Sequence, residues 1–193
     1  SKTMKAWETI NMPTLQDMPS DYRPTWNQCT YSSSDESVVK PTGNSAKLIF
    51  GGSGYGKTAT ITITIPQTNK YNEKKLTYTV TVDNEMRIGS KADWQAFADQ
   101  VNGGNKSINA TMTADVDLGT DITMVGTSNN RYSGTFDGQG HSIQIDWTTS
   151  KSSVAPFNTI GDATIKNVRI TGQITTSSVW TAGLVLDNWG TSK

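Results

Sequence analysis

The sequence predicts a mostly β protein in two parts. Residues 1–84 are expected to form an antiparallel β-sandwich, and residues 85–193 a short right-handed parallel β-helix capped by one α-helix. Three observations predict this. Apolar residues make up only 34% of the 193, while Thr, Ser, Asn and Gly are abundant, as is typical of short strands joined by turns. Segments that alternate Thr with apolar residues fill the first part. The second part has one helical pattern followed by a succession of short strand patterns.

The overall composition excludes several classes of function. Lys plus Arg equals Asp plus Glu, 17 against 17, so the sequence does not favour nucleic acid or an acidic membrane as a partner. No apolar run approaches the roughly 18 residues of a membrane span. Cys29 and His141 are the only residues of their types. A disulfide framework or a Cys/His zinc cluster within one chain is therefore excluded.

Residues 51–58, GGSGYGKT, match the phosphate-binding pattern G-x-x-x-x-G-K-[ST]. That chemistry requires a helix after the loop, because the phosphates rest on helix N-terminal amides. The following residues, TATITITI, instead alternate with period two and are β-branched, which predicts a strand. We expect no nucleotide site. The glycine-rich segment is predicted to join strands at 45–50 and 58–65 as a β-hairpin.

The first part contains further alternating segments broken by Gly, Pro and Asn, which favour an antiparallel sandwich. One is KLTYTVTVDN, residues 75–84, with its apolar side chains on one face. Residues 30–65, TYSSSDESVVKPTGNSAKLIFGGSGYGKTATITITI, resemble the bacterial group-2 immunoglobulin-like domain. That family has a similar Ser-Ser-Asp-x-x-Val segment and a glycine before an alternating Thr/Ile strand. The resemblance covers about residues 5–83 and implies an immunoglobulin-like β-sandwich.

The second part opens with the one segment that clearly predicts a helix, SKADWQAFADQVNGG, residues 90–104. Ser90 and Asp93 form a capping box, and two glycines end the pattern. Apolar residues recur at i, i+3, i+4 and i+7, at Trp94, Phe97, Ala98 and Val101. Among the strand patterns that follow, Ile143 and Ile165 are 22 residues apart. This spacing is close to one coil of a parallel β-helix.

This second part resembles the N-terminal β-helix region of bacterial surface proteins that bear GLUG-type repeats. The resemblance is carried by the Asp-x-Asp-Leu segment at 115–118, the GTFDGQGH turn at 134–141 and the Ile-x-Asn-Val rung at 165–168. It implies a bacterial exterior location, in an adhesin or large surface protein. The family continues after Gly-Leu-Val-Gly, whereas Leu186 follows Val185 here. We therefore expect an open β-helix end, at which a longer parent chain continues, the last segment folds over the end, or two molecules self-associate.

Acidic residues in these motifs are candidate metal ligands. Asp115 and Asp117 leave one face of a strand, and with Asp121 and Asp137 they offer oxygen ligands suited to calcium. A pair could alternatively act as general acid and base on a sugar. In the structural alternative, which the resemblance favours, these carboxylates accept backbone N–H bonds in turns. His141 is interpreted as a turn residue. Asn167 is expected in an asparagine ladder along the β-helix.

Four aromatic residues are candidate ligand-binding residues, because they lie in segments rich in Thr, Ser and Asn: Tyr132, Trp147, Trp180 and Trp189. Flat aromatic faces beside hydroxyl and amide groups suit sugar rings. In the alternative, Trp147 packs within a rung, and Trp180 and Trp189 cover the C-terminal coil.

The sequence thus predicts a non-catalytic, extracellular, adhesin-like or spacer module of a bacterial cell surface that binds a glycan or a host matrix protein. No cofactor is expected beyond calcium, and no catalytic residue is assigned. The alternative is the N-terminal part of a polysaccharide-degrading or peptidase-bearing surface enzyme. In that case Asp115, Asp117 or Asp137 would lie in its site.

Overall fold

A computed structural model describes residues 1–12, 18–22, 24–43, 46–177 and 179–191. The protein is mostly β: the described residues form sixteen strands, a short 3-10 helix and one α-helix. The chain divides into two compact units, Ser1–Asn84 (unit 1) and Glu85–Lys193 (unit 2). Within the described ranges, no helix has the length and apolar character that a membrane crossing requires.

In unit 1 the described residues form two sheets. The larger has the strand order β1-β7-β6-β3, in which β1 runs parallel to β7 and the other pairs are antiparallel. The smaller is antiparallel, with the order β2-β5-β4. The strands are β1 Lys2–Met4, β2 Thr9–Asn11, β3 Thr30–Ser33, β4 Val39–Pro41, β5 Lys47–Phe50, β6 Thr58–Ile65 and β7 Lys74–Val82, and the 3-10 helix η1 is Trp26–Gln28.

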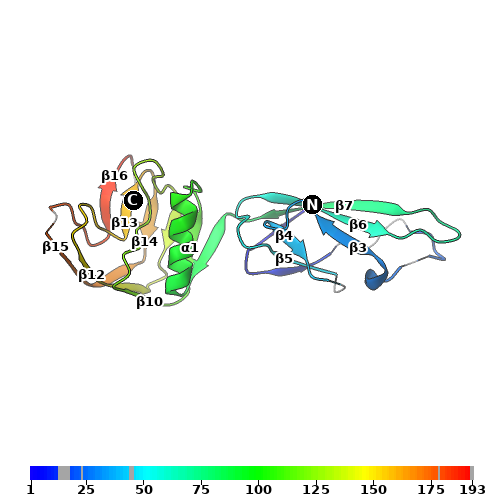
Figure 1. The fold of residues 1–193 in the computed structure, drawn as a ribbon, viewed down its shortest axis with the longest axis horizontal. Helices are drawn as coiled ribbons and strands as arrows, with labels where there is room; N and C mark the ends of the chain where they lie inside the picture. The colour runs from blue at the N-terminus through cyan, green and yellow to red at the C-terminus, as the bar shows by residue number, and fades with distance from the viewer. Residues whose placement is uncertain (13–17, 23, 44–45, 178, 192–193) are drawn as a thin grey trace. The chain divides into compact units, whose positions relative to one another are not determined.

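Figure 1 shows β6 and β7 side by side in unit 1. The predicted alternation is confirmed in both strands. Ile61 and Ile63 of β6 are buried while the intervening threonines are partly exposed. Val80 and Val82 of β7 are buried in the same way. These side chains join Leu48 of the smaller sheet in one hydrophobic core, so the apolar face of each sheet is removed from water.

The glycine-rich segment between β5 and β6 does not form the predicted hairpin. A strand, β6, does follow Thr58, as expected. However, β5 pairs with β2 and β4, whereas β6 pairs with β3 and β7, so the connection passes from one sheet to the other. Period-two alternation predicts a strand but does not specify its partner. A Cβ at Gly51 would lie 2.0 Å from the Glu36 carbonyl oxygen, so glycine permits a close backbone approach here.

The described residues of unit 2 form three sheets, in which each strand pair is parallel. Their orders are β8-β9-β11-β14, β10-β12-β15 and β13-β16. The elements are β8 Glu85–Ile88, α1 Lys91–Asn102, β9 Asn109–Met112, β10 Val116–Gly119, β11 Thr135–Asp137, β12 Ser142–Thr149, β13 Phe157–Ile160, β14 Thr164–Lys166, β15 Arg169–Thr176 and β16 Val185–Asn188.

Successive passes of the chain stack strand on strand through these sheets. Val116 pairs with Ile143, and Ile143 pairs with Ile170, so the chain repeats every 27 residues in this sheet. The side-chain hydrogen bond from Gln173 to Asp146 also joins residues 27 apart. The predicted 22-residue coil from Ile143 to Ile165 is therefore wrong, because Ile165 pairs with Phe136 in a different sheet. Ile143 lies near the start of β12 and Ile165 near the start of β14, so the two isoleucines look equivalent in the sequence.

The α-helix α1 begins and ends close to the predicted residues. Ser90 Oγ accepts a hydrogen bond from the Asp93 backbone N–H at 3.2 Å, and Asp93 Oδ2 accepts one from the Gly89 N–H at 3.1 Å. The helix buries the predicted apolar stripe. Its Trp94 and Phe97 rings lie within 6 Å of Phe136 of β11. Figure 1 shows α1 beside the strands of unit 2. Helix packing thereby covers the interior of this unit.

Candidate functional site

Two of the four predicted ligand-binding aromatics lie in the core instead. Tyr132 and Trp147 are both 0% exposed. Tyr132 packs edge-on against Phe97 at a centroid distance of 5.3 Å, and Trp147 is an inward-facing residue of β12. Neither ring has a face on which a sugar could stack, so these two assignments are corrected. Their segments are polar in composition, but the alternation of β12 turns Trp147 inward. Tyr132, at an isolated bridge with Ile160, is buried as well.

The other two aromatics, Trp180 and Trp189, are exposed by 67% and 54%. Trp180 precedes the bridge between Thr181 and Val154. Trp189 directly follows β16, and its indole Nε1–H donates to Asp187 Oδ2 at 2.6 Å. Of the two, Trp189 lies in a hollow of the surface.

The three candidate metal ligands each have a separate partner. Asp115 Oδ1 accepts the Ser142 backbone N–H at 2.7 Å, and Asp117 Oδ1 accepts the Gly119 N–H at 2.8 Å. Asp121 forms an ion pair with Lys91 of α1. Within the described ranges, no three His, Cys, Asp or Glu side chains are grouped so that they could hold a metal ion. The structure therefore does not bring these carboxylates together.

Two of the three carboxylates named for the enzymatic alternative, Asp115 and Asp137, are held ionised by hydrogen bonds. The Ser142 backbone N–H lowers the pKa of Asp115, with a smaller effect from His141, whose Nδ1 lies 3.4 Å from Asp115 Oδ1. The Gln139 backbone N–H, followed by the Asn167 side chain, lowers the pKa of Asp137 to about 2. A general acid for glycoside cleavage needs a raised pKa. Both shifts run in the opposite direction.

A polar groove of about 410 Å³ lies beside Trp189. The residues that line it belong to several segments that connect or follow strands, not to a single sequence motif. Backbone bonds hold these connections together: Ser133 N–H donates to the Lys106 carbonyl at 2.8 Å, and Gly161 N–H donates to the Tyr132 carbonyl at 2.8 Å. The lining residues are Lys106, Ser128, Asn129, Arg131, Ser133, Gly161, Asp162 and Trp189. We call this hollow the polar groove.

Arg131 and Trp189 are stacked in the polar groove. The guanidinium carbon of Arg131 lies 4.4 Å from the centroid of the Trp189 ring, a favourable cation–π arrangement. Arg131 is partly buried, and its Nε atom is shielded from solvent without an acceptor among the described residues. The stacking holds both side chains in place while more than half of Trp189 stays exposed.

In the described lining of the polar groove, the remaining charged residues are one cation and one carboxylate. Lys106 is exposed. Asp162 Oδ1 accepts the Thr191 backbone N–H at 2.9 Å and its hydroxyl at 3.1 Å, and these bonds lower the pKa of Asp162. Asp162 is thus engaged in holding the chain around residue 191. Among the described lining residues, two cations accompany one carboxylate that is already engaged, and the Asp187 carboxylate accepts a hydrogen bond from the Trp189 indole beside them.

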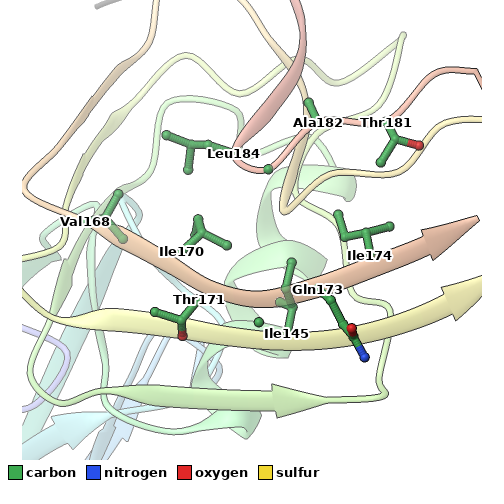
Figure 2. Close-up of a pocket in the computed structure, with 11 residues that line it drawn as sticks. Ile145, Val168, Ile170, Thr171, Gln173, Ile174, Thr181, Ala182 and Leu184 are labelled. Carbon is green, nitrogen blue, oxygen red and sulfur yellow. The ribbon is translucent and has the colours of Figure 1, made fainter.

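A second, apolar groove of about 470 Å³ lies along β15. Figure 2 shows Val168, Ile170 and Ile174 facing this groove, with Ala182 and Leu184 across from them. Ile170 and Ile174 are partly exposed, whereas the residues they pair with in β12, Ile143 and Trp147, are fully buried. The described lining carries no ionisable side chain. This groove can therefore offer apolar surface and backbone groups, but no acid or base.

Sequence reasoning found Trp189 but missed Arg131 and Lys106. Both cations lie in connecting segments that carry no periodic pattern, and the polar groove unites segments that are far apart in the chain. No known protein family, curated protein or solved structure matches this chain.

Proposed function

We propose that the chain is a non-catalytic module of a bacterial cell surface, adhesin-like in role, which binds a glycan in the polar groove of unit 2. In this proposal unit 1 is an immunoglobulin-like sandwich that acts as a spacer. Unit 2 is a short right-handed parallel β-helix, capped by α1, that presents the groove. The resemblance of residues 90–185 to GLUG-bearing surface proteins supports the location. The parallel strand stacking at a 27-residue repeat supports the architecture.

The observation that carries the binding function is the position of Trp189. Its indole is 54% exposed, lies at a polar hollow, and is fixed by Arg131 and by its own bond to Asp187. An exposed aromatic ring of fixed orientation beside hydrogen-bonding groups offers a sugar both a stacking face and polar partners. Fixing the ring before binding also reduces the entropy lost on association.

The test is binding of the 193-residue protein to a mixed array of glycans and extracellular matrix proteins. Trp189→Ala is expected to abolish the glycan signal, because it removes the stacking face. Trp180→Ala is the matched control, since it removes an even more exposed indole that lies outside the polar groove. Binding that survives Trp189→Ala, or a blank array with the native protein, would contradict the proposal.

A further inference from the structure

We propose that the polar groove selects acidic sugars, with the guanidinium of Arg131 and the ammonium of Lys106 receiving a carboxylate of the ligand. This inference rests on the proposed glycan-binding function and names its ligand class.

The first argument is the state of Arg131. None of the described carboxylates lies within ion-pair distance of its guanidinium, and its solvent-shielded Nε has no acceptor among the described residues. A partly desolvated cation is unfavourable without an opposite charge or a full set of hydrogen bonds. The Trp189 ring compensates only in part, because a cation–π contact is weaker than a charge-assisted hydrogen bond. The site is completed by an anion.

The second argument is the charge balance of the groove. The one carboxylate in the lining, Asp162, is occupied by the Thr191 backbone N–H and hydroxyl. Lys106 is exposed, and no described carboxylate pairs with it. The described lining therefore presents two cations to a ligand, within a protein whose formal net charge is zero. A neutral sugar would leave both cations unpaired.

The third argument separates a carboxylated sugar from a simple anion. The planar guanidinium fork matches the geometry of a carboxylate, and the neighbouring indole supplies a flat apolar face for a sugar ring. Ser128, Asn129 and Ser133 add small polar side chains that suit ring hydroxyls. The volume of about 410 Å³ lies within the usual range for small-molecule sites, about 300–1,000 Å³.

The experiment compares three trisaccharides by titration calorimetry: galacturonic acid trimer, its full methyl ester, and a sulfated neutral trimer of the same length. The acid is expected to bind at least about tenfold more tightly than the ester, because esterification removes the charge that pairs with the cations. Its affinity is also expected to fall as NaCl is raised.

Variants of Arg131 and Lys106 test whether these two side chains cause the preference for the acid over the ester. Arg131→Gln and Lys106→Gln are each expected to weaken acid binding by about tenfold or more while leaving the weak ester binding unchanged. Arg131→Lys is expected to recover part of the loss, since it restores charge without the planar fork. Arg169→Gln is the matched control, because it removes an exposed arginine outside the groove. Lys106 is exposed on a turn, so its variant remains informative even if Arg131→Gln unfolds.

The outcomes separate the two proposals. Equal binding of acid and ester, or acid binding unaffected by Lys106→Gln and by a folded Arg131→Gln, would overturn the acidic-sugar inference and leave glycan binding standing. Equal binding of the sulfated trimer would overturn the choice of carboxylate. Failure of all three trimers together with a blank glycan array would overturn both proposals.

Discussion

The side-chain amide of Asn167 donates a hydrogen bond to Asp137 Oδ1 at 3.1 Å, which joins the residue after β14 to the last residue of β11, 30 residues earlier in the chain. The same oxygen accepts the Gln139 backbone N–H at 3.0 Å, and the Asn167 carbonyl accepts the Gly140 N–H at 2.7 Å. The expected ladder of like asparagines is thus not formed here, because Asn167 bonds to an aspartate of the preceding pass. Asp137 and Asn167 connect successive passes of unit 2.

The bonds that Asp137 accepts, first from the Gln139 backbone N–H and then from Asn167, make the stability of unit 2 depend on pH. The pKa of Asp137 falls from 3.8 to about 2 in the folded state, so folding favours the ionised carboxylate. Its stabilising contribution is complete above about pH 4 and is lost as the pH falls towards 2. The pKa values of Asp115 and Asp162 are also lowered in the folded protein, so they add to the same pH dependence. Comparing the native protein with Asp137→Asn isolates the contribution of Asp137.

Urea unfolding of the native protein and of Asp137→Asn should be measured from pH 6 to pH 2.5. The native protein is expected to be the more stable at pH 6, and the difference is expected to shrink below about pH 4. A difference that stays constant across the range would contradict a depressed pKa at Asp137.

Gly172 is expected to be essential to the contact between β12 and β15. Its φ is +99°, and a Cβ there would lie 1.8 Å from the Ile145 carbonyl oxygen. Gly172→Ala should therefore lower the free energy of unfolding by more than about 2 kcal/mol, since neither strand can move aside without losing its pairing. Gly183→Ala is the matched control, because nothing lies within 4 Å of its added Cβ. That control should stay within about 0.5 kcal/mol of the native protein.

The sequence was most informative where the structure is local. The cap and stripe of α1 are set by residues within about two turns of each other, so Ser90 and the apolar positions that follow could be identified directly. The alternation of β6 likewise follows from its own residues. The sequence did not indicate which strands pair with each other. Both β5 and β6 have the pattern of a strand, but they lie in different sheets.

The candidate site was predictable only in part, for the same reason. Trp189 could be singled out by residue type. The burial of Tyr132 depends on which face of its segment meets α1, and the polar character of that segment predicted the opposite. Arg131 reaches Trp189 only because separate passes of the chain stack, and single-sequence patterns carry no information about that contact.

Calcium is expected to leave the protein unchanged. The candidate ligands Asp115, Asp117 and Asp121 each have a separate partner, two of them backbone N–H groups and one Lys91, whereas a calcium site needs about six to eight convergent oxygen ligands. The melting temperature should agree within error in calcium and in chelator. A rise in calcium that is reversed by chelator and removed by Asp117→Asn would contradict this expectation.

Tyr132 offers a test of whether the aromatic core of unit 2 needs its one hydroxyl. The side chain is fully buried, its hydroxyl oxygen has no hydrogen-bond partner among the described residues, and burial raises the pKa of the phenol. A buried polar group without a partner opposes folding. Tyr132→Phe should therefore leave the free energy of unfolding within about 1 kcal/mol of the native value or increase it.

The comparison variant is Tyr132→Ala, which removes the ring contacts with Phe97 and Phe157 and should cost about 3–5 kcal/mol through the cavity it leaves. Both variants are measured by urea unfolding at neutral pH. A large loss in Tyr132→Phe would mean that the hydroxyl has a stabilising partner in solution, and the core would then be polar at that point. A large loss only in Tyr132→Ala would establish that the ring stabilises the packing against α1 and that the hydroxyl contributes nothing to it.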